Sequence, residues 1–95
     1  MSLAVDTITR DLPIVNQRGL HARASAKFVQ TVNRFNAAVT VEKDGVSVGG
    51  NSIMGLMMLA ASPGCCIRVS ATGEDAVDVI AALEALIADR FGEEI

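Results

Sequence analysis

The sequence predicts an α+β fold in which helices cover one face of a single sheet. Four short segments have the residue pattern of strands, three have apolar residues at helical spacing, and an Asp-Gly pair joins two of the strands. Their order along the 95 residues is β-α-β-β-α-β-α. This order is typical of one domain, spanning residues 1–95, with helices packed on one sheet.

The first two elements are a strand and a helix. Apolar residues between Leu3 and Val15 follow strand spacing, and Pro13 argues against a helix there. A polar loop at residues 16–19 follows. The next apolar residues recur at helical spacing and predict a helix that begins beside His21, with one face formed by Ala22, Ala26, Phe28, Val29, Val32 and Phe35.

The middle of the chain predicts a hairpin and a short helix. Residues 38–42 and 46–48 read as strands on either side of the Asp44-Gly45 turn. Asn51 or Ser52 can cap a helix that runs to about Leu59 and ends before a Ser-Pro-Gly turn.

The last two elements are a strand over residues 66–71 and a helix. Thr72 and Asp75 have the spacing of a helix-capping pair, and Gly92 is a suitable stop. The buried face of this helix is predicted to contain Ala76, Ile80, Leu83 and Ile87.

Composition excludes several classes of function. A net charge of -3 with only three aromatic residues, all Phe, argues against binding nucleic acid. Adjacent Cys65 and Cys66 lack the spacing of a metal-binding pair, so we expect neither a metal nor another cofactor. The sequence contains neither a membrane-spanning run nor a secretion signal, so we expect a cytoplasmic protein.

The residues that carry chemistry surround the single histidine, in the stretch Gly19-Leu20-His21-Ala22-Arg23. Unpaired amides and the dipole at a helix start attract anions and disfavour a charged imidazole. His21 is therefore suited to act as a neutral nucleophile, and Arg23 can hold phosphate oxygens. A lone His beside an Arg at a helix start is nevertheless most often an ordinary surface residue.

This stretch resembles the active-site motif of the histidine-containing phosphocarrier family (HPr/NPr-like) of bacterial phosphotransferase systems. Residues 51–59, Asn-Ser-Ile-Met-Gly-Leu-Met-Met-Leu, resemble its second signature. The resemblance extends from about Thr9 to Phe91. It implies an open-faced β-sandwich, with four antiparallel strands in the order 1-4-2-3 and three helices on one face.

The resemblance also implies roles for individual residues. His21 would accept a phosphoryl group on Nδ1 from the phosphohistidine of the phosphoenolpyruvate-dependent enzyme I, and pass it to an EIIA-type protein. Such a carrier is not an enzyme in its own right, and we expect a monomer. Ser52 aligns with a serine that a dedicated kinase phosphorylates in some branches. The expected docking residues for partners are Leu20, Ile53, Met54 and Met57.

The methionine-rich helix has two interpretations. Its apolar side chains cannot all face inward, so at least one or two must be exposed, although core packing is the more frequent role for any single one. Methionine also suits a surface that must fit several partners, because its side chain is flexible and polarizable.

One departure from the family pattern leaves alternatives open. Ala24 stands where the family usually has proline; the helix should survive, but the alternative of a non-relaying regulatory module of the same fold remains. A small enzyme such as a phosphatase is disfavoured, because His21 has no evident acid-base partner. The sequence does not distinguish the sugar-transport branch from the nitrogen-regulation branch.

Overall fold

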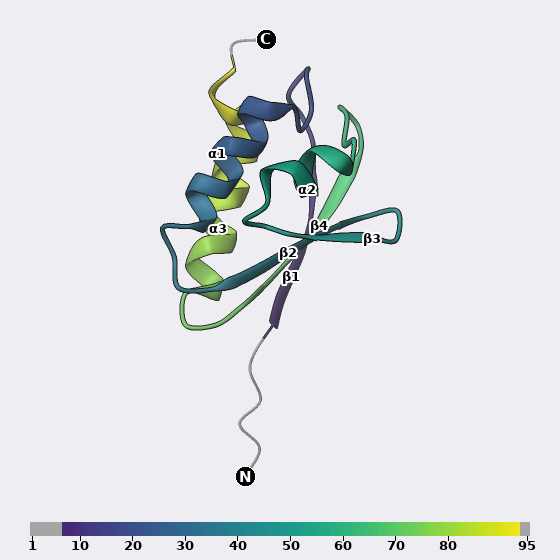
Figure 1. Cartoon of the computed structure of the whole chain (residues 1–95). Coiled ribbons are helices and arrows are strands. Elements are labelled where there is room, and N and C mark those ends of the chain that lie inside the picture. Colours follow the sequence, from purple (N-terminus) through teal and green to yellow (C-terminus); the bar gives the residue numbers. More distant parts are fainter. Residues whose placement is uncertain (1–6, 94–95) are drawn as a thin grey trace.

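Four strands form one antiparallel sheet in the order β1-β4-β2-β3, as expected. The computed structural model describes residues 7–93, so the first four residues of the strand predicted from Leu3 lie outside the described residues. The strands are β1 (Thr7–Pro13), β2 (Ala38–Lys43), β3 (Val46–Gly49) and β4 (Cys66–Thr72). Figure 1 shows β1, β2 and β4 crossing near the middle of the view, to the right of α1 and α3.

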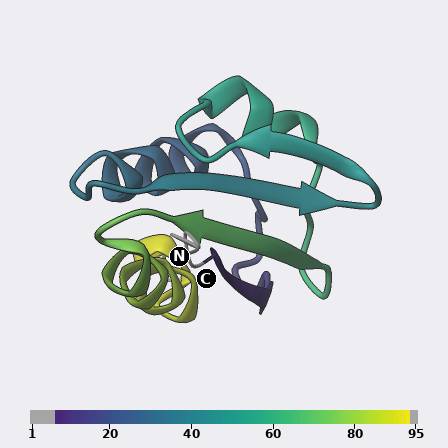
Figure 2. The same cartoon turned by 90° about the horizontal axis from the view of Figure 1, so that it is seen from below.

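The helices are α1 (Ala22–Val32), α2 (Ile53–Met58) and α3 (Ala76–Ala88), followed by the short turn η1 (Arg90–Gly92). Helices α1 and α3 lie side by side. Figure 2 shows both helices on the side of the sheet where β2 begins and the antiparallel β4 ends. Helix α2 packs against α1 and β3.

The core lies between the sheet and these helices because each strand turns alternate side chains inward. Val41 on β2 pairs with Val69 on β4, and Leu12 on β1 pairs with Ile67 on β4. All four are buried. The opposite face of the sheet is polar, with a Thr9–Ser70 hydroxyl contact of 3.0 Å and an Arg68–Asp11 ion pair.

The inward face of α1 is rotated from the predicted one. Phe28, Val29 and Val32 are buried as expected, but Ala22 is exposed and Ala24 is fully buried. The helix therefore forms with alanine in place of the family's usual proline, and this alanine packs in the core.

The predicted cap of α3 was wrong. Thr72 is the last residue of β4, and its hydroxyl contacts that of Thr7 at 2.9 Å. Asp75 precedes the helix but accepts from the backbone amide of Asn36 at 2.7 Å. Neither side chain caps α3, because each of them contacts another segment of the chain. Helix α3 also ends at Ala88, before the predicted stop at Gly92.

Candidate functional site

His21 is the residue that immediately precedes α1. Its backbone is extended (φ -74°, ψ -179°), and its side chain caps the helix by accepting from the amide of Arg23, with 3.3 Å between that nitrogen and Nδ1. The side chain is 24% exposed. The expected junction of loop and helix is thus confirmed, and Nδ1 points at the amides of the first helical turn.

The loop that carries His21 is held against the segment between α2 and β4. The amide of Leu20 donates to the carbonyl of Ala61 at 3.0 Å, and the amide of Ile14 donates to the carbonyl of Cys65 at 2.8 Å. The hydroxyl of Ser25 donates to the carbonyl of Leu20 at 3.2 Å. These bonds fix the backbone on both sides of the histidine.

Glu93 contacts the other nitrogen of the imidazole ring. Its Oε2 lies 2.6 Å from Nε2 of His21, and its side chain is 13% exposed. The amide Nδ2 of the fully buried Asn16 lies 3.2 Å from both oxygens of Glu93 and also donates to the carbonyl of Gly19.

The Glu93 carboxylate is stabilised in its charged form by these neighbours. Burial by itself would raise the pKa of Glu93, but the hydrogen bonds from His21 and Asn16 and the charges of His21 and Arg18 lower the pKa below its ordinary value. The site therefore contains a carboxylate that stays ionised beside the imidazole.

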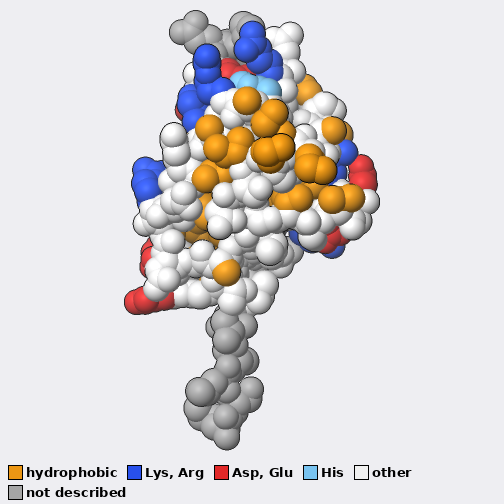
Figure 3. All heavy atoms as spheres, in the orientation of Figure 1, with side chains coloured by type: hydrophobic (Ala, Val, Ile, Leu, Met, Phe, Trp, Pro, Cys, Tyr) orange, Lys and Arg blue, Asp and Glu red, His pale blue; other side chains and the backbone are white. Residues whose placement is uncertain are grey.

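Arg23 stands in the first turn of α1, where its side chain is exposed. Its guanidinium forms no ion pair with any carboxylate among residues 7–93. Figure 3 shows the single histidine at one end of the molecule with Lys and Arg side chains on both sides. A guanidinium in this position can bind the oxygens of a phosphoryl group on the ring.

Asn51 and Ser52 were the two residues expected to cap α2, and Ser52 is the one that does so. Its Oγ accepts from the amide of Gly55 at 3.0 Å, and its side chain is half-buried. A Cβ on Gly55 would lie 2.9 Å from this oxygen, so glycine leaves the serine room.

An apolar patch surrounds α2 and reaches the histidine in Figure 3. The patch consists of Ile53, Met54, Met57 and Met58, which are 40%, 74%, 43% and 77% exposed. The interpretation of these methionines as core residues is therefore wrong, whereas Leu56 and Leu59 are buried. Leu20 is also buried at 4% exposure, so its side chain belongs to the core and not to the patch.

Sequence reasoning missed three contributors to this region. Glu93 and Asn16 were not singled out, because Glu93 is 72 residues from His21 and Asn16 was assigned to a polar loop. Met58 was left out of the docking residues although it is the most exposed of the four. The unusually apolar composition of residues 53–59 was the only signal for it.

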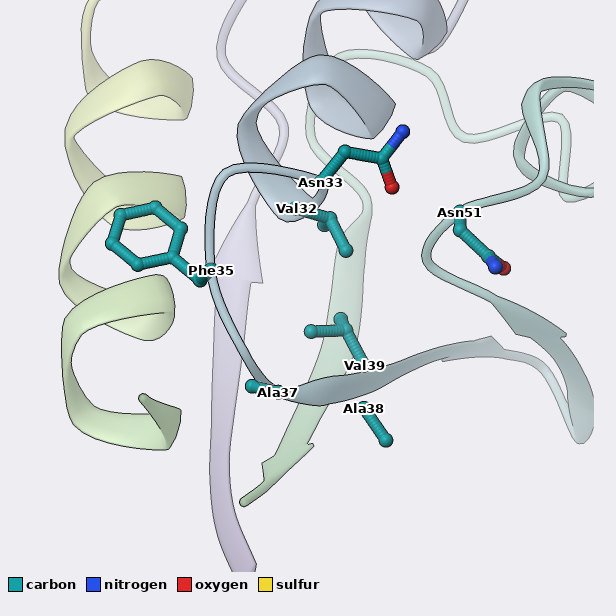
Figure 4. Close-up of a pocket in the computed structure, with 7 residues that line it drawn as sticks. All are labelled: Val32, Asn33, Phe35, Ala37, Ala38, Val39 and Asn51. Atoms are coloured by element: carbon teal, nitrogen blue, oxygen red, sulfur yellow. The ribbon is translucent and has the colours of Figure 1, made fainter. Parts of the chain in front are cut away.

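Other parts of the described chain offer less for chemistry. A hollow of about 270 Å³ lies between the end of α1 and the start of β2, where Val32 and Val39 point into it and Asn33 and Asn51 border it (Figure 4). It contains no titratable side chain. Residues 7–93 contain no cluster of three or more His, Cys, Asp or Glu suited to a metal, and none of their helices has the length and apolarity to cross a membrane.

Comparisons with known proteins all lead to one group. A family model described as "PTS HPr component phosphorylation site" matches residues 8–89. The phosphocarrier protein HPr of Xylella fastidiosa is 45% identical over 87 residues, covering 92% of this chain and 98% of the relative. A crystal structure of HPr from Thermoanaerobacter tengcongensis superposes with a TM-score of 0.88 at 44% identity, covering 93% and 99% of the two chains. HPr from Bacillus anthracis gives a TM-score of 0.81 at 40% identity, covering 85% and 96%.

Proposed function

Because this chain belongs to the HPr family of phosphocarrier proteins of the phosphotransferase system, we propose that it carries the phosphoryl group on Nδ1 of His21. The phosphohistidine is transient: the group arrives from the phosphohistidine of an enzyme I-type donor and leaves to a histidine of an EIIA-type protein. The position of His21 at the start of α1 is the observation that carries this proposal.

The geometry around Nδ1 suits both the free and the phosphorylated ring. In the free protein the amide of Arg23 donates to Nδ1 over a long 3.3 Å bond. Once a phosphoryl group occupies Nδ1, its oxygens can accept from this amide and its neighbours, and the helix dipole favours their charge. The exposed guanidinium of Arg23 adds donors of fixed geometry.

The apolar patch of Ile53, Met54, Met57 and Met58 provides the docking surface in this proposal. Donor and acceptor must each bring a histidine to the same ring, so both must bind the same side of the carrier in turn. Exposed methionines are suited to such a shared surface because they adapt to different partners. We propose that the carrier works as a monomer in the cytoplasm.

Phosphorylation of Ser52 by a protein kinase is the regulatory part of the proposal. Ser52 directly precedes the patch and its hydroxyl is half-buried. A phosphate dianion there would have to be desolvated when a partner docks, which weakens docking without unfolding the domain.

Phosphorylation of the purified protein tests the relay. Incubation with enzyme I and phosphoenolpyruvate should add one acid-labile phosphoryl group, detected by intact mass and assigned to Nδ1 by phosphorus NMR. Replacement of the single histidine in His21→Ala should abolish labelling. Unimpaired labelling of His21→Ala, or none of the wild-type protein, contradicts the proposal.

A further inference from the structure

All the methionines among residues 7–93 lie on one helix, α2. The chain has four methionines, of which Met1 lies outside the described residues. The others are Met54, Met57 and Met58, which are 74%, 43% and 77% exposed. Because these positions are three and four residues apart, their side chains share one face of the helix. Three thioethers are therefore clustered on a surface that solvent reaches.

The core, in contrast, contains no methionine among the described residues. Its buried side chains are those of Ala, Val, Leu, Ile and Phe only. Methionine is elsewhere a common filler of irregular gaps in cores. Helix α2 follows the same division, since its inward residues Leu56 and Leu59 are buried leucines. A reagent that attacks thioethers therefore meets the surface of α2 and leaves the core intact.

Oxidation of these thioethers would affect docking far more than folding. It converts an apolar, flexible side chain into a polar sulfoxide. On the free protein an exposed sulfoxide is hydrated, so it costs the fold little. In a docked complex the sulfoxide oxygen would lose its water, and a polar group buried without a hydrogen-bond partner weakens binding.

We propose that Met54, Met57 and Met58 form a reversible oxidation site through which peroxide slows the phosphoryl relay. This inference rests on the proposed function, in which both partners dock on the apolar patch. The sulfur lone pair attacks one oxygen of hydrogen peroxide, so that an S–O bond forms while the O–O bond breaks. The transferred oxygen gives its proton to the departing hydroxide, which leaves as water. Sulfur loses two electrons and the peroxide gains them.

The reverse step needs a methionine sulfoxide reductase. Such an enzyme removes the oxygen as water at the expense of two thiols, which become a disulfide. The sulfoxide is thus a modification that can be undone, and the carrier regains its apolar patch without new synthesis.

Two thiols of the same chain compete for the oxidant. Cys66 is exposed and Cys65 is half-buried. Hydrogen bonds from the side chain and backbone of Ser62 lower the pKa of Cys65, which favours its reactive thiolate. Sulfenic acids and disulfides formed there are reduced by a small thiol such as dithiothreitol, whereas a methionine sulfoxide requires the reductase. The two kinds of oxidation can therefore be separated.

The first test locates the oxidation and needs no partner protein. The purified chain is treated with limited hydrogen peroxide, then with catalase and dithiothreitol. Peptide mapping, which separates Met1 from the others, should find the added oxygens on Met54 and Met58 first and on Met57 later, in the order of their exposure. The melting temperature should fall by less than about 4 °C. Unmodified methionines on α2, or a much larger fall, would overturn the proposal.

The second test measures the rate at which enzyme I and phosphoenolpyruvate label His21, with the carrier well below saturation. Each protein is compared with itself before and after the same peroxide treatment. The fully oxidised wild type should be labelled about tenfold more slowly, since a sulfoxide loses its hydrogen bonds to water on docking. Treatment with a methionine sulfoxide reductase should restore the original rate.

Two variants assign the effect to the methionines. The double variant Cys65→Ser, Cys66→Ser keeps the three thioethers, so peroxide should slow its labelling by the same factor as in the wild type. The triple variant Met54→Leu, Met57→Leu, Met58→Leu has apolar side chains of similar volume with no sulfur, so peroxide should not change its rate.

The outcomes separate this proposal from the proposed function. If the wild type is labelled equally fast before and after oxidation, or if peroxide slows the triple leucine variant as much as the wild type, the oxidation site does not control the relay. Absence of labelling in the unoxidised wild type would instead refute the proposed function. The peptide map and the melting temperature would still decide whether α2 is the selective target of peroxide.

Discussion

Gly19 packs so closely on Ala61 that no side chain fits between them. A Cβ on Gly19 would lie 2.1 Å from the carbonyl oxygen of Ala61, and the φ of Gly19 is +64°. This contact seats the histidine loop on the segment that follows α2, so the two signature stretches of the sequence are held together through backbone atoms.

Gly19→Ala should therefore lower the free energy of unfolding by at least about 2 kcal/mol, because it adds a backbone clash to the cost of a left-handed alanine. Urea denaturation measures this. Gly64→Ala is the control: its φ is +90°, but nothing lies within 4 Å of a Cβ there. Equal losses in the two variants would mean that the close approach is relaxed in solution.

Arg23→Ala should slow phosphorylation of His21 about tenfold or more, because one charge-assisted contact worth about 1.5–3 kcal/mol is lost from the transfer state. Stability should change little, since Arg23 is exposed. Arg34→Ala removes the same charge from the exposed segment after α1 and should leave the rate close to the wild type. Initial rates of labelling decide whether Arg23 takes part.

Met54→Glu should weaken binding to both enzyme I and the acceptor, because it places a charge in the middle of the proposed docking surface. Its side chain is 74% exposed, so the melting temperature should hardly change. Val77→Glu, at a position on α3 that is 67% exposed, serves as the control. Titration calorimetry with each partner measures the affinity. If Met54→Glu binds both partners as tightly as Val77→Glu and the wild type do, this docking surface is excluded.

Ser52→Asp should keep the fold but slow the labelling of His21, whereas Ser52→Ala should be labelled at nearly the wild-type rate. The free energy of unfolding should rank the two variants in the opposite order. Ser52→Ala should lose about 1 kcal/mol, because it removes the bond from the amide of Gly55, whereas the aspartate of Ser52→Asp can still cap α2. Labelling rates for the three proteins test the regulatory role of Ser52, and urea denaturation curves test its role as the cap of α2. Wild-type labelling of Ser52→Asp would leave only the capping role.

The lowered pKa of Glu93 predicts a loss of stability in acid. Because its pKa in the folded protein lies below the ordinary 4.5, its ionised form stabilises the fold above that value, and this contribution disappears as the pH falls through the folded pKa. The difference in unfolding free energy between wild type and Glu93→Gln should therefore be constant at neutral pH and shrink below about pH 4.5. A difference that does not depend on pH in this range would show that the carboxylate gains nothing on folding.

Local patterns in the sequence predicted the order of elements and the place of His21. Apolar spacing and the Asp44-Gly45 turn located the helices and the hairpin, and the apolar excess of residues 53–59 required exposed side chains on α2. These features depend on neighbours a few residues apart, which is the range over which helical and strand periodicity act.

The tertiary structure alone decided which groups meet at the imidazole. Thr72 and Asp75 have the spacing of a cap, yet contacts with Thr7 and Asn36 use both side chains. Nothing in the local pattern of Phe91 indicates a left-handed backbone, which is held by core packing and by the bond from Lys27. The contact between Glu93 and His21 follows from that turn, because the point where α3 ends and the direction in which the chain then leaves are set by long-range packing and not by residue spacing.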